Sequence, residues 1–186
     1  MKFKRVWLSV AGAFALIAAS ALLVSDSSAS SRTTVIYTFT NRDDGGGPSS
    51  GVIFDAARNA YGTTVGGGLF RHGTIYKLEP TPSGQWVETV LWNFGTGGDG
   101  RYPYGGLTSD GAGDLFGTAS GGGRQGFCVG GCGIVFELTR TRFLVLYSFR
   151  YGSDGFVPFG PVVFDRLGNL YGETFGGGTQ DRKSVV

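Results

Sequence analysis

The chain repeats itself at a spacing of 55 residues over most of its length. Five registers share this spacing, namely Phe39, Phe94 and Phe149; Asp44, Asp99 and Asp154; Pro48, Pro103 and Pro158; Asp55, Asp110 and Asp165; and Gly62, Gly117 and Gly172. Such self-similarity is typical of small units that bury their apolar faces only against their neighbours. The period therefore constrains the fold more tightly than any single residue does.

Each repeat contains four short strand patterns. The first alternates apolar residues as a half-buried strand does, and in the first repeat it comprises Val35, Tyr37 and Phe39. The later patterns read GVIFD, NAYGTT and GTIYKL, with Gly, Asp and Pro clusters between them. The sequence therefore predicts an all-β fold of tandem four-stranded antiparallel repeats of about 55 residues. Units of this size are typical of β-propeller blades, here in an incomplete ring, and a β-solenoid is the alternative.

The repeat also sets the expected domain boundaries. We expect repeats at residues 35–89, 90–144 and 145–180, of which the third lacks its fourth strand pattern. Residues 181–186 break the pattern, and we interpret them as a translated sequencing adapter rather than native sequence. On this interpretation the chain is the front part of a longer array.

The N-terminus has the pattern of a secretory signal peptide. Three basic residues precede an apolar run that ends in the small-x-small sequence Ala-Ser-Ala. We expect residues 1–21 to be a signal peptide, cleaved after Ala21 or near Ala29, and residues 22–34 to be a polar linker. An uncleaved membrane anchor is the alternative, because the apolar character continues to Val24.

The charge balance argues against a nucleic-acid partner. The chain has 16 basic and 14 acidic residues, and removal of the three basic residues in the signal leaves 13 against 14. The remaining arginines are scattered rather than gathered in a basic stripe. We expect no nucleic-acid partner, and membrane contact only through the signal segment or a missing C-terminal anchor.

The repeat signatures resemble a known family. The sequences DAARNAYGTTVGGG, DGAGDLFGTASGGG and DRLGNLYGETFGGG, joined to GTIYKL or CGIVFEL and to VLWNF or VLYSF, are similar to the GloVer tandem repeat of bacterial choice-of-anchor proteins. The resemblance covers about residues 35–180. It implies an exported protein destined for the cell surface or the extracellular space, with the periplasm as the alternative. It implies no established activity and supplies no catalytic residues.

Two cysteines, Cys128 and Cys132, lie among glycines in an enlarged loop of the second repeat. In an exported protein this spacing predicts a disulfide, whose stabilising effect is modest because the ring that it closes is small. A zinc site is the alternative, but it needs four ligands. The only histidine is His72, which lies in the equivalent loop of the first repeat.

The repeated aspartates are the candidates for a metal site. Calcium needs six to eight oxygen ligands, whereas each loop supplies one or two carboxylates. We expect the aspartates to cap tight turns by accepting hydrogen bonds from their own backbone. The triple glycines lack the strand and helix context of a phosphate loop. We therefore expect no cofactor, and calcium is the alternative.

Aromatic residues that follow the Asp-Gly turns are the candidates for ligand binding. Four of them occur in the second and third repeats, namely Tyr102, Tyr104, Phe156 and Phe159. Exposed rings stack on sugars or pack against peptides, and the alternative is that they cover the core between blades. These residues predict a binding, adhesion or structural module whose partner is a polysaccharide or a surface protein.

Catalysis is the alternative function. A fragment of a propeller-type hydrolase or lyase that acts on extracellular polysaccharide would need polar residues that depart from the repeat. His72 and Glu173 depart from it, but neither carries a motif, and we assign no catalytic residue.

Overall fold

The computed structural model describes residues 33–95, 98–124 and 127–178. The predicted signal peptide, all but the end of the linker, and the segment 181–186 lie outside these residues. Within the described part of the chain, no helix is long and apolar enough to cross a membrane.

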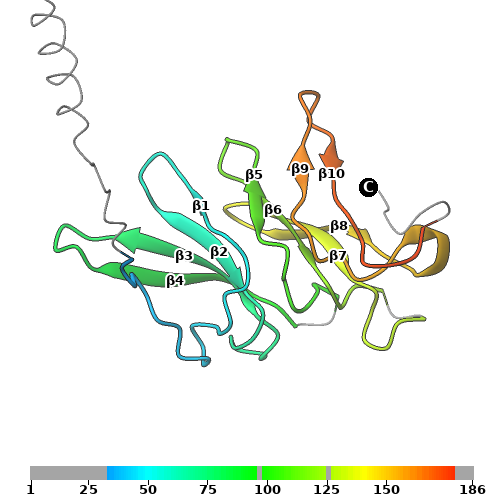
Figure 1. Ribbon diagram of the computed structural model, residues 1–186, viewed down its shortest axis with the longest axis horizontal. Coiled ribbons are helices and arrows are strands. Elements are labelled where there is room, and N and C mark those ends of the chain that lie inside the picture. Colours follow the sequence, from blue (N-terminus) through cyan, green and yellow to red (C-terminus); the bar gives the residue numbers. More distant parts are fainter. Residues whose placement is uncertain (1–32, 96–97, 125–126, 179–186) are drawn as a thin grey trace, which may run out of the picture. The chain divides into compact units, whose positions relative to one another are not determined.

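The strands form three antiparallel sheets (Figure 1). Sheet 1 has the order β1 (Ile53–Phe54), β2 (Ala60–Thr64), β3 (Thr74–Pro80) and β4 (Trp86–Asn93). Sheet 2 has the order β5 (Leu107–Ser109), β6 (Leu115–Ala119), β7 (Ile134–Leu138) and β8 (Phe143–Ser148). Sheet 3 has two described strands, β9 (Val163–Phe164) and β10 (Leu170–Tyr171). A single 3₁₀ turn, η1 (Gly152–Asp154), interrupts this all-β arrangement of the described residues. The predicted tandem four-stranded antiparallel architecture is confirmed.

The sheets and the sequence repeats are out of phase by one strand. β4 contains the pattern that opens the second sequence repeat, yet it pairs with β3 of sheet 1, with Val90 opposite Tyr76 and Trp92 opposite Ile75. β8 pairs with β7 in the same way. The cause is local, because a tight turn closed by a hydrogen bond from the Thr81 amide to the Gln85 carbonyl folds β4 back on β3. The expected boundaries at residues 89/90 and 144/145 therefore fall inside sheets.

The first copy of this strand pattern behaves differently. Residues 35–39 are not in a strand, so the prediction of a strand there is wrong. The reason is that the described chain offers them no strand equivalent to β3 with which to pair. Their side chains still pack, because the Phe39 ring lies 4.7 Å from the Tyr76 ring, centroid to centroid, and Tyr37 joins the same cluster.

Each sheet has two faces, because neighbouring residues of a strand point to opposite sides. We call front the face of sheet 1 that carries Ala60, Tyr76 and Leu78. We call back the opposite face, which carries Ile53, Tyr61 and Ile75. The equivalent residues define the front and back faces of sheets 2 and 3.

The sheets pack front to back. Leu115, Phe136 and Leu138 on the front of sheet 2 share a core with Ile75 on the back of sheet 1. The front of sheet 3 packs on the back of sheet 2 in the same way, with Phe164 5.0 Å from Phe116 in an edge-to-face arrangement.

The repeated phenylalanines anchor this packing. Phe94 and Phe149 follow β4 and β8, are at most 1% exposed, and lie in the first and second core respectively. Burial of one such side chain contributes about 1.5–3 kcal/mol. Phenylalanine therefore recurs at positions 39, 94 and 149 because this position packs in a core.

Hydrogen bonds join successive sheets at equivalent positions. The Thr63 hydroxyl donates to the Pro103 carbonyl at 2.8 Å, and the Thr118 hydroxyl donates to the Gly160 carbonyl at 2.9 Å. Glu173 occupies the third-repeat position of these threonines. The two described junctions between sheets therefore share a polar tie as well as an apolar core.

The triple glycines allow two backbone segments to approach closely. A Cβ atom on the middle glycine of the second triplet, Gly122, would lie 2.5 Å from Cα of Gly100 in the Asp-Gly turn. Gly67 and Gly177 stand in the same relation to the turns of their own repeats, and all three have positive φ angles. The triplets are therefore packing elements.

Candidate functional site

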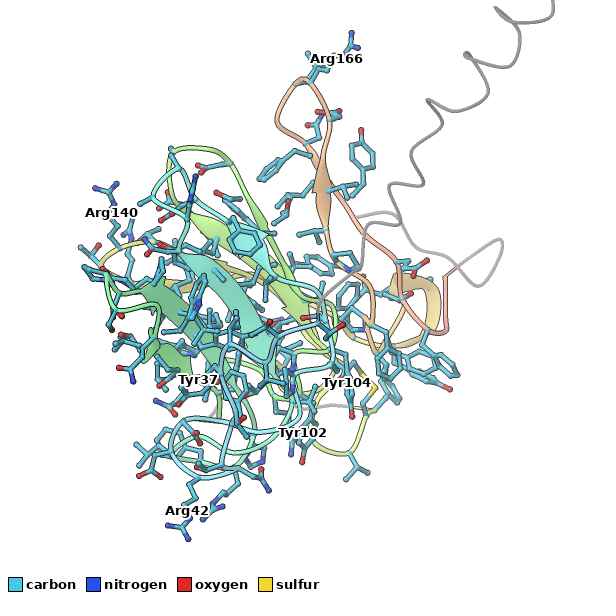
Figure 2. The ribbon with its side chains drawn as sticks, turned by 60° about the vertical axis from the view of Figure 1, so that its left-hand side comes forward. Tyr37, Arg42, Tyr102, Tyr104, Arg140 and Arg166 are labelled. Atoms are coloured by element: carbon cyan, nitrogen blue, oxygen red, sulfur yellow. A yellow bond between two sulfur atoms is a disulfide. The ribbon has the colours of Figure 1, made fainter. Side chains whose placement is uncertain are left out.

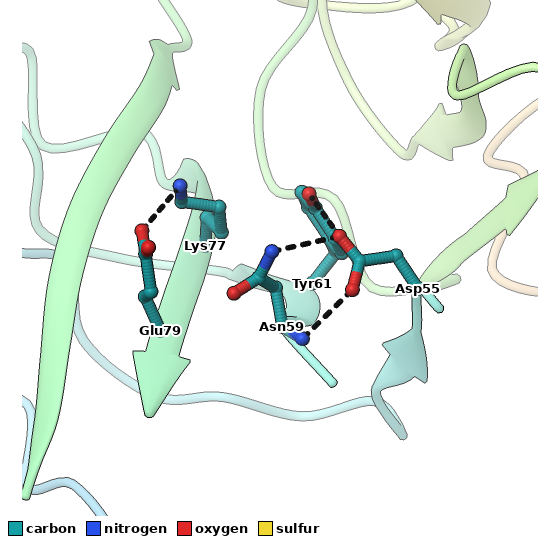
Figure 3. Close-up of polar contacts among 5 residues, drawn as sticks. All are labelled: Asp55, Asn59, Tyr61, Lys77 and Glu79. Carbon is teal, nitrogen blue, oxygen red and sulfur yellow. Dashed lines mark hydrogen bonds and ion pairs between the residues drawn. The ribbon is translucent and has the colours of Figure 1, made fainter. Parts of the chain in front are cut away.

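The repeated aspartates cap turns. The Asp55 carboxylate accepts hydrogen bonds from the amide and side chain of Asn59, both at 2.8 Å, and from the Tyr61 hydroxyl at 3.0 Å (Figure 3). In the third repeat, the hydrogen bonds that the side chain and backbone of Asn169 donate lower the pKa of Asp165 to about 2. Within the described residues, no group of three or more His, Cys, Asp or Glu side chains is placed to hold a metal ion.

The second aspartate register closes a different turn. Asp44 accepts a hydrogen bond from the Thr40 amide at 2.8 Å, and Asp154 accepts one from the Arg150 amide at 2.7 Å. Asp99 accepts from the amide of Gly95, also four residues earlier in the chain. These carboxylates are engaged by their own backbone, as the turn interpretation predicts.

Cys128 and Cys132 are joined by a disulfide, with the sulfur atoms 1.99 Å apart and the Cα atoms 5.1 Å apart. Cys132 is buried in the core shared by sheets 2 and 3. The disulfide therefore ties the enlarged loop of the second repeat to a packed region.

The four aromatic candidates do not form one cluster. The rings of Tyr104 and Phe159 contact each other edge to face, with their centroids 5.0 Å apart. The Tyr102 ring instead stacks on the His72 ring, at 5.5 Å between centroids. Phe156 is half-buried and packs against the second core. Figure 2 labels Tyr102 and Tyr104, which are both about two-fifths exposed. Their role in ligand binding stays a prediction.

The two off-pattern polar residues have separate surroundings. The ring nitrogen Nδ1 of His72 lies 2.5 Å from the Phe70 carbonyl. Glu173 lies against Gly160, where a Cβ atom would come within 3.0 Å of its carboxylate. Neither contact brings the two residues together.

A groove between sheets 1 and 2 is the site that sequence reasoning missed. It has a volume of about 750 Å³ and is lined by residues from both sheets. One wall comprises the β1–β2 hairpin with Tyr61, and Lys77 on β3. The other comprises the glycine-rich β5–β6 turn and the β7–β8 hairpin with Arg140 and Arg142.

The groove exists because one large side chain is missing from the packing of sheet 2. The strands β1 and β9 end in Phe54 and Phe164, whereas the equivalent strand of sheet 2, β5, ends in Ser109. Phe164 contacts Phe116 across the second junction, but Ser109 cannot fill the equivalent space beside Tyr61. The first junction is therefore open at this end.

Two stacked aromatic rings are among the residues that line the groove. Trp92 and Phe143 are stacked at 4.5 Å with an angle of 8° between their planes. The indole nitrogen of Trp92 is buried without a hydrogen-bond partner. The other repeats place Tyr37 and Tyr147 at this position, and their hydroxyls donate to Asp44 and Asp154. Trp92 therefore departs from the repeat inside the groove.

The charged residues of the groove are mainly basic. Lys77, Arg140 and Arg142 line it, and Asp55 is the acidic residue among the described lining residues. Asp55 is engaged by Asn59 and Tyr61, and Lys77 lies 2.7 Å from Glu79, which raises the pKa of Lys77 through their hydrogen bond (Figure 3). The walls therefore favour an anionic ligand.

Comparisons with known proteins give one result. A family model described as the Gloeobacter/Verrucomicrobia repeat matches residues 22–186. No curated protein and no solved structure matches the chain.

Glu88 on β4 has a carboxyl group that is partly buried outside the groove. Its Oε1 atom is buried without a hydrogen-bond partner. Desolvation, with a smaller contribution from the charge of Asp44, raises the pKa of Glu88 to about 7. Because the folded pKa exceeds the unfolded one, this group stabilises the fold below about pH 4.5, and that contribution is lost as the pH rises through 7.

We therefore expect Glu88→Gln to flatten the decline in unfolding free energy between pH 4.5 and 7, because the amide does not ionise. Urea denaturation across this pH range measures the effect. The matched control is Glu173→Gln, since Glu173 is exposed. An unchanged slope in Glu88→Gln, or an equal change in the control, would contradict the assignment.

Proposed function

The chain belongs to the Gloeobacter/Verrucomicrobia repeat family, and we propose that it is an exported, surface-associated protein that binds a polysaccharide in the groove between sheets 1 and 2. The repeated sheets act as a scaffold, and the departure from the repeat at Ser109 and Trp92 makes the binding site. The groove is the observation that carries this proposal.

Export is supported by two features. The first 21 residues have the pattern of a signal peptide, and the bonded pair Cys128 and Cys132 is typical of an oxidising compartment. We expect the protein recovered outside the cytoplasm of a bacterial host to begin after Ala21 or near Ala29. N-terminal sequencing measures this, and recovery of a chain that still begins with Met1 in the cytoplasm would contradict it.

The groove has the chemistry of a sugar-binding site. Its volume lies within the range of ligand pockets in proteins, about 300–1,000 Å³. Tyr61, Trp92 and Phe143 offer apolar aromatic surface, which packs against the C–H faces of sugars. The guanidinium groups of Arg140 and Arg142 can bind carboxylates through two parallel hydrogen bonds. An acidic polysaccharide combines both features.

Binding fits the groove better than hydrolysis does. Most glycoside hydrolases use two carboxyl groups that flank the scissile bond. Asp55 is the one carboxylate among the described lining residues, and it already accepts three hydrogen bonds that hold the β1–β2 turn. Its geometry serves the turn.

Isothermal titration calorimetry tests the proposal with an oligogalacturonate and a neutral cello-oligosaccharide of the same length. We expect the acidic probe to bind more tightly, with an affinity that falls as salt is added. The double change Arg140→Gln and Arg142→Gln should weaken binding about tenfold or more, because the bidentate contacts of two guanidinium groups with carboxylates are lost.

The matched control is Arg166→Gln. Figure 2 shows Arg140 and Arg166 on different elements, with Arg166 at the tip of the β9–β10 turn. Loss of affinity in the control, equal binding of the neutral probe, or no binding of either probe would contradict the proposal. Equal binding of a polyglutamate peptide would instead indicate an acidic protein partner.

A further inference from the structure

The first junction has only half of an aromatic pair that is complete at the second junction. There, the rings of Phe116 and Phe164 meet edge to face, with their centroids 5.0 Å apart and an angle of 85° between their planes. The residues 55 positions earlier in the chain are Tyr61 and Ser109. Tyr61 supplies the first ring of the pair, whereas Ser109 supplies no second ring.

The surroundings of the absent ring are the same at both junctions. Ser109 lies opposite Leu115 on β6, as Phe164 lies opposite Leu170 on β10. Phe164 and Leu170 both pack against the core shared by sheets 2 and 3. Leu115 is buried in the core shared by sheets 1 and 2, and Tyr61 packs against that core. The apolar contacts that would hold a ring at position 109 are therefore in place.

The turn that follows β5 leaves this space open. Its sequence is Asp-Gly-Ala-Gly-Asp, whereas the equivalent β9–β10 turn has Arg166 and Leu167 at its second and third positions. A Cβ atom on Gly111 would come within 4 Å of no described residue apart from its chain neighbours. Tyr61, Ser109 and Gly111 all line the groove. The place of the absent ring is therefore a part of the groove that a ligand can enter.

A cation lies beside the same turn. The guanidinium group of Arg140 approaches Gly113, where a Cβ atom would lie 3.7 Å from the Nη2 atom of Arg140. Guanidinium groups bind carboxylates through two parallel hydrogen bonds. A ligand that places a ring beside Tyr61 can therefore present a carboxylate to Arg140. A molecule that carries both an aromatic ring and a carboxylate matches this part of the groove.

We propose that the groove binds an aromatic ring of its ligand in the place of the missing phenylalanine side chain, beside Tyr61 and Leu115. The ligand class that this assigns is an acidic polysaccharide that carries aromatic acyl esters. The inference deepens the proposed function and rests on it, because it concerns the same groove. An apolar space left by a missing core side chain can bind a free aromatic molecule. Edge-to-face contact with Tyr61 favours an aromatic ring over a saturated ring of the same size.

Isothermal titration calorimetry with three small anions tests the inference. The first, 3-phenylpropionate, joins the phenylalanine side chain to a carboxylate; 3-cyclohexylpropionate has a saturated ring, and propionate has none. We expect 3-phenylpropionate to bind about tenfold or more tightly than propionate, because its ring is buried. It should bind about two- to tenfold more tightly than 3-cyclohexylpropionate. Nuclear Overhauser effects from its ring protons should reach Tyr61 and Leu115.

Ser109→Phe restores the ring that β1 and β9 carry. We expect it to weaken the binding of 3-phenylpropionate about tenfold or more, because its own ring fills the space. The matched control is Ser83→Phe, which adds the same ring on the exposed β3–β4 turn outside the groove and should bind as the unaltered chain does. The ranking of the three anions and the Overhauser effects are measured on the unaltered chain, so they decide the question even if Ser109→Phe does not fold.

Three results would overturn the inference, namely equal affinity for the aromatic and saturated rings, Overhauser effects only to residues outside the groove, or an equal loss of affinity in Ser83→Phe. Failure of 3-phenylpropionate to bind, together with binding of oligogalacturonate, would overturn the inference and leave the proposed function intact. Binding of 3-phenylpropionate that Ser109→Phe abolishes, without binding of oligogalacturonate, would support the aromatic site and overturn the polysaccharide as its ligand.

Discussion

The pairing of β4 with β3, and of β8 with β7, is the interaction on which the rest of the structure depends. Each of these strands is bonded to the sheet before it, and each is followed by a phenylalanine that packs with the sheet after it. Each such strand and its phenylalanine therefore join two sheets. Backbone hydrogen bonds hold the strand to the preceding sheet, and burial of the phenylalanine holds it to the following sheet. The period of 55 residues is the spacing of this joint.

This arrangement explains why the candidate site lies at a junction. At the second junction Phe164, at the end of β9, packs against Phe116 of the preceding sheet, whereas Ser109, at the end of β5, is too small to fill the equivalent space at the first junction. The space that remains is bordered by loops from both sheets, where substitutions do not disturb the joint.

The sequence was sufficient to predict the strands of sheets 1 and 2 and the turns between them, because these depend on neighbours in the chain. It was not sufficient to predict that Val90 would pair backward with Tyr76, since the alternating pattern does not show which neighbour a strand joins. The groove could not be foreseen for the same reason. Trp92, where the other repeats have tyrosine, and Ser109, where they have phenylalanine, were visible as departures from the period, but their proximity depends on how the sheets stack.

Hydrogen exchange of individual amides, followed by NMR, tests the central claim most directly. The account predicts that the β4 and β8 amides that face β3 and β7 exchange slowly, while the amides of residues 35–39, which carry the same strand pattern but are not in a strand, exchange fast. Equal protection of all three segments, or fast exchange in β4 and β8, would contradict the account. Either result would show that β4 and β8 do not complete the sheets that contain β3 and β7.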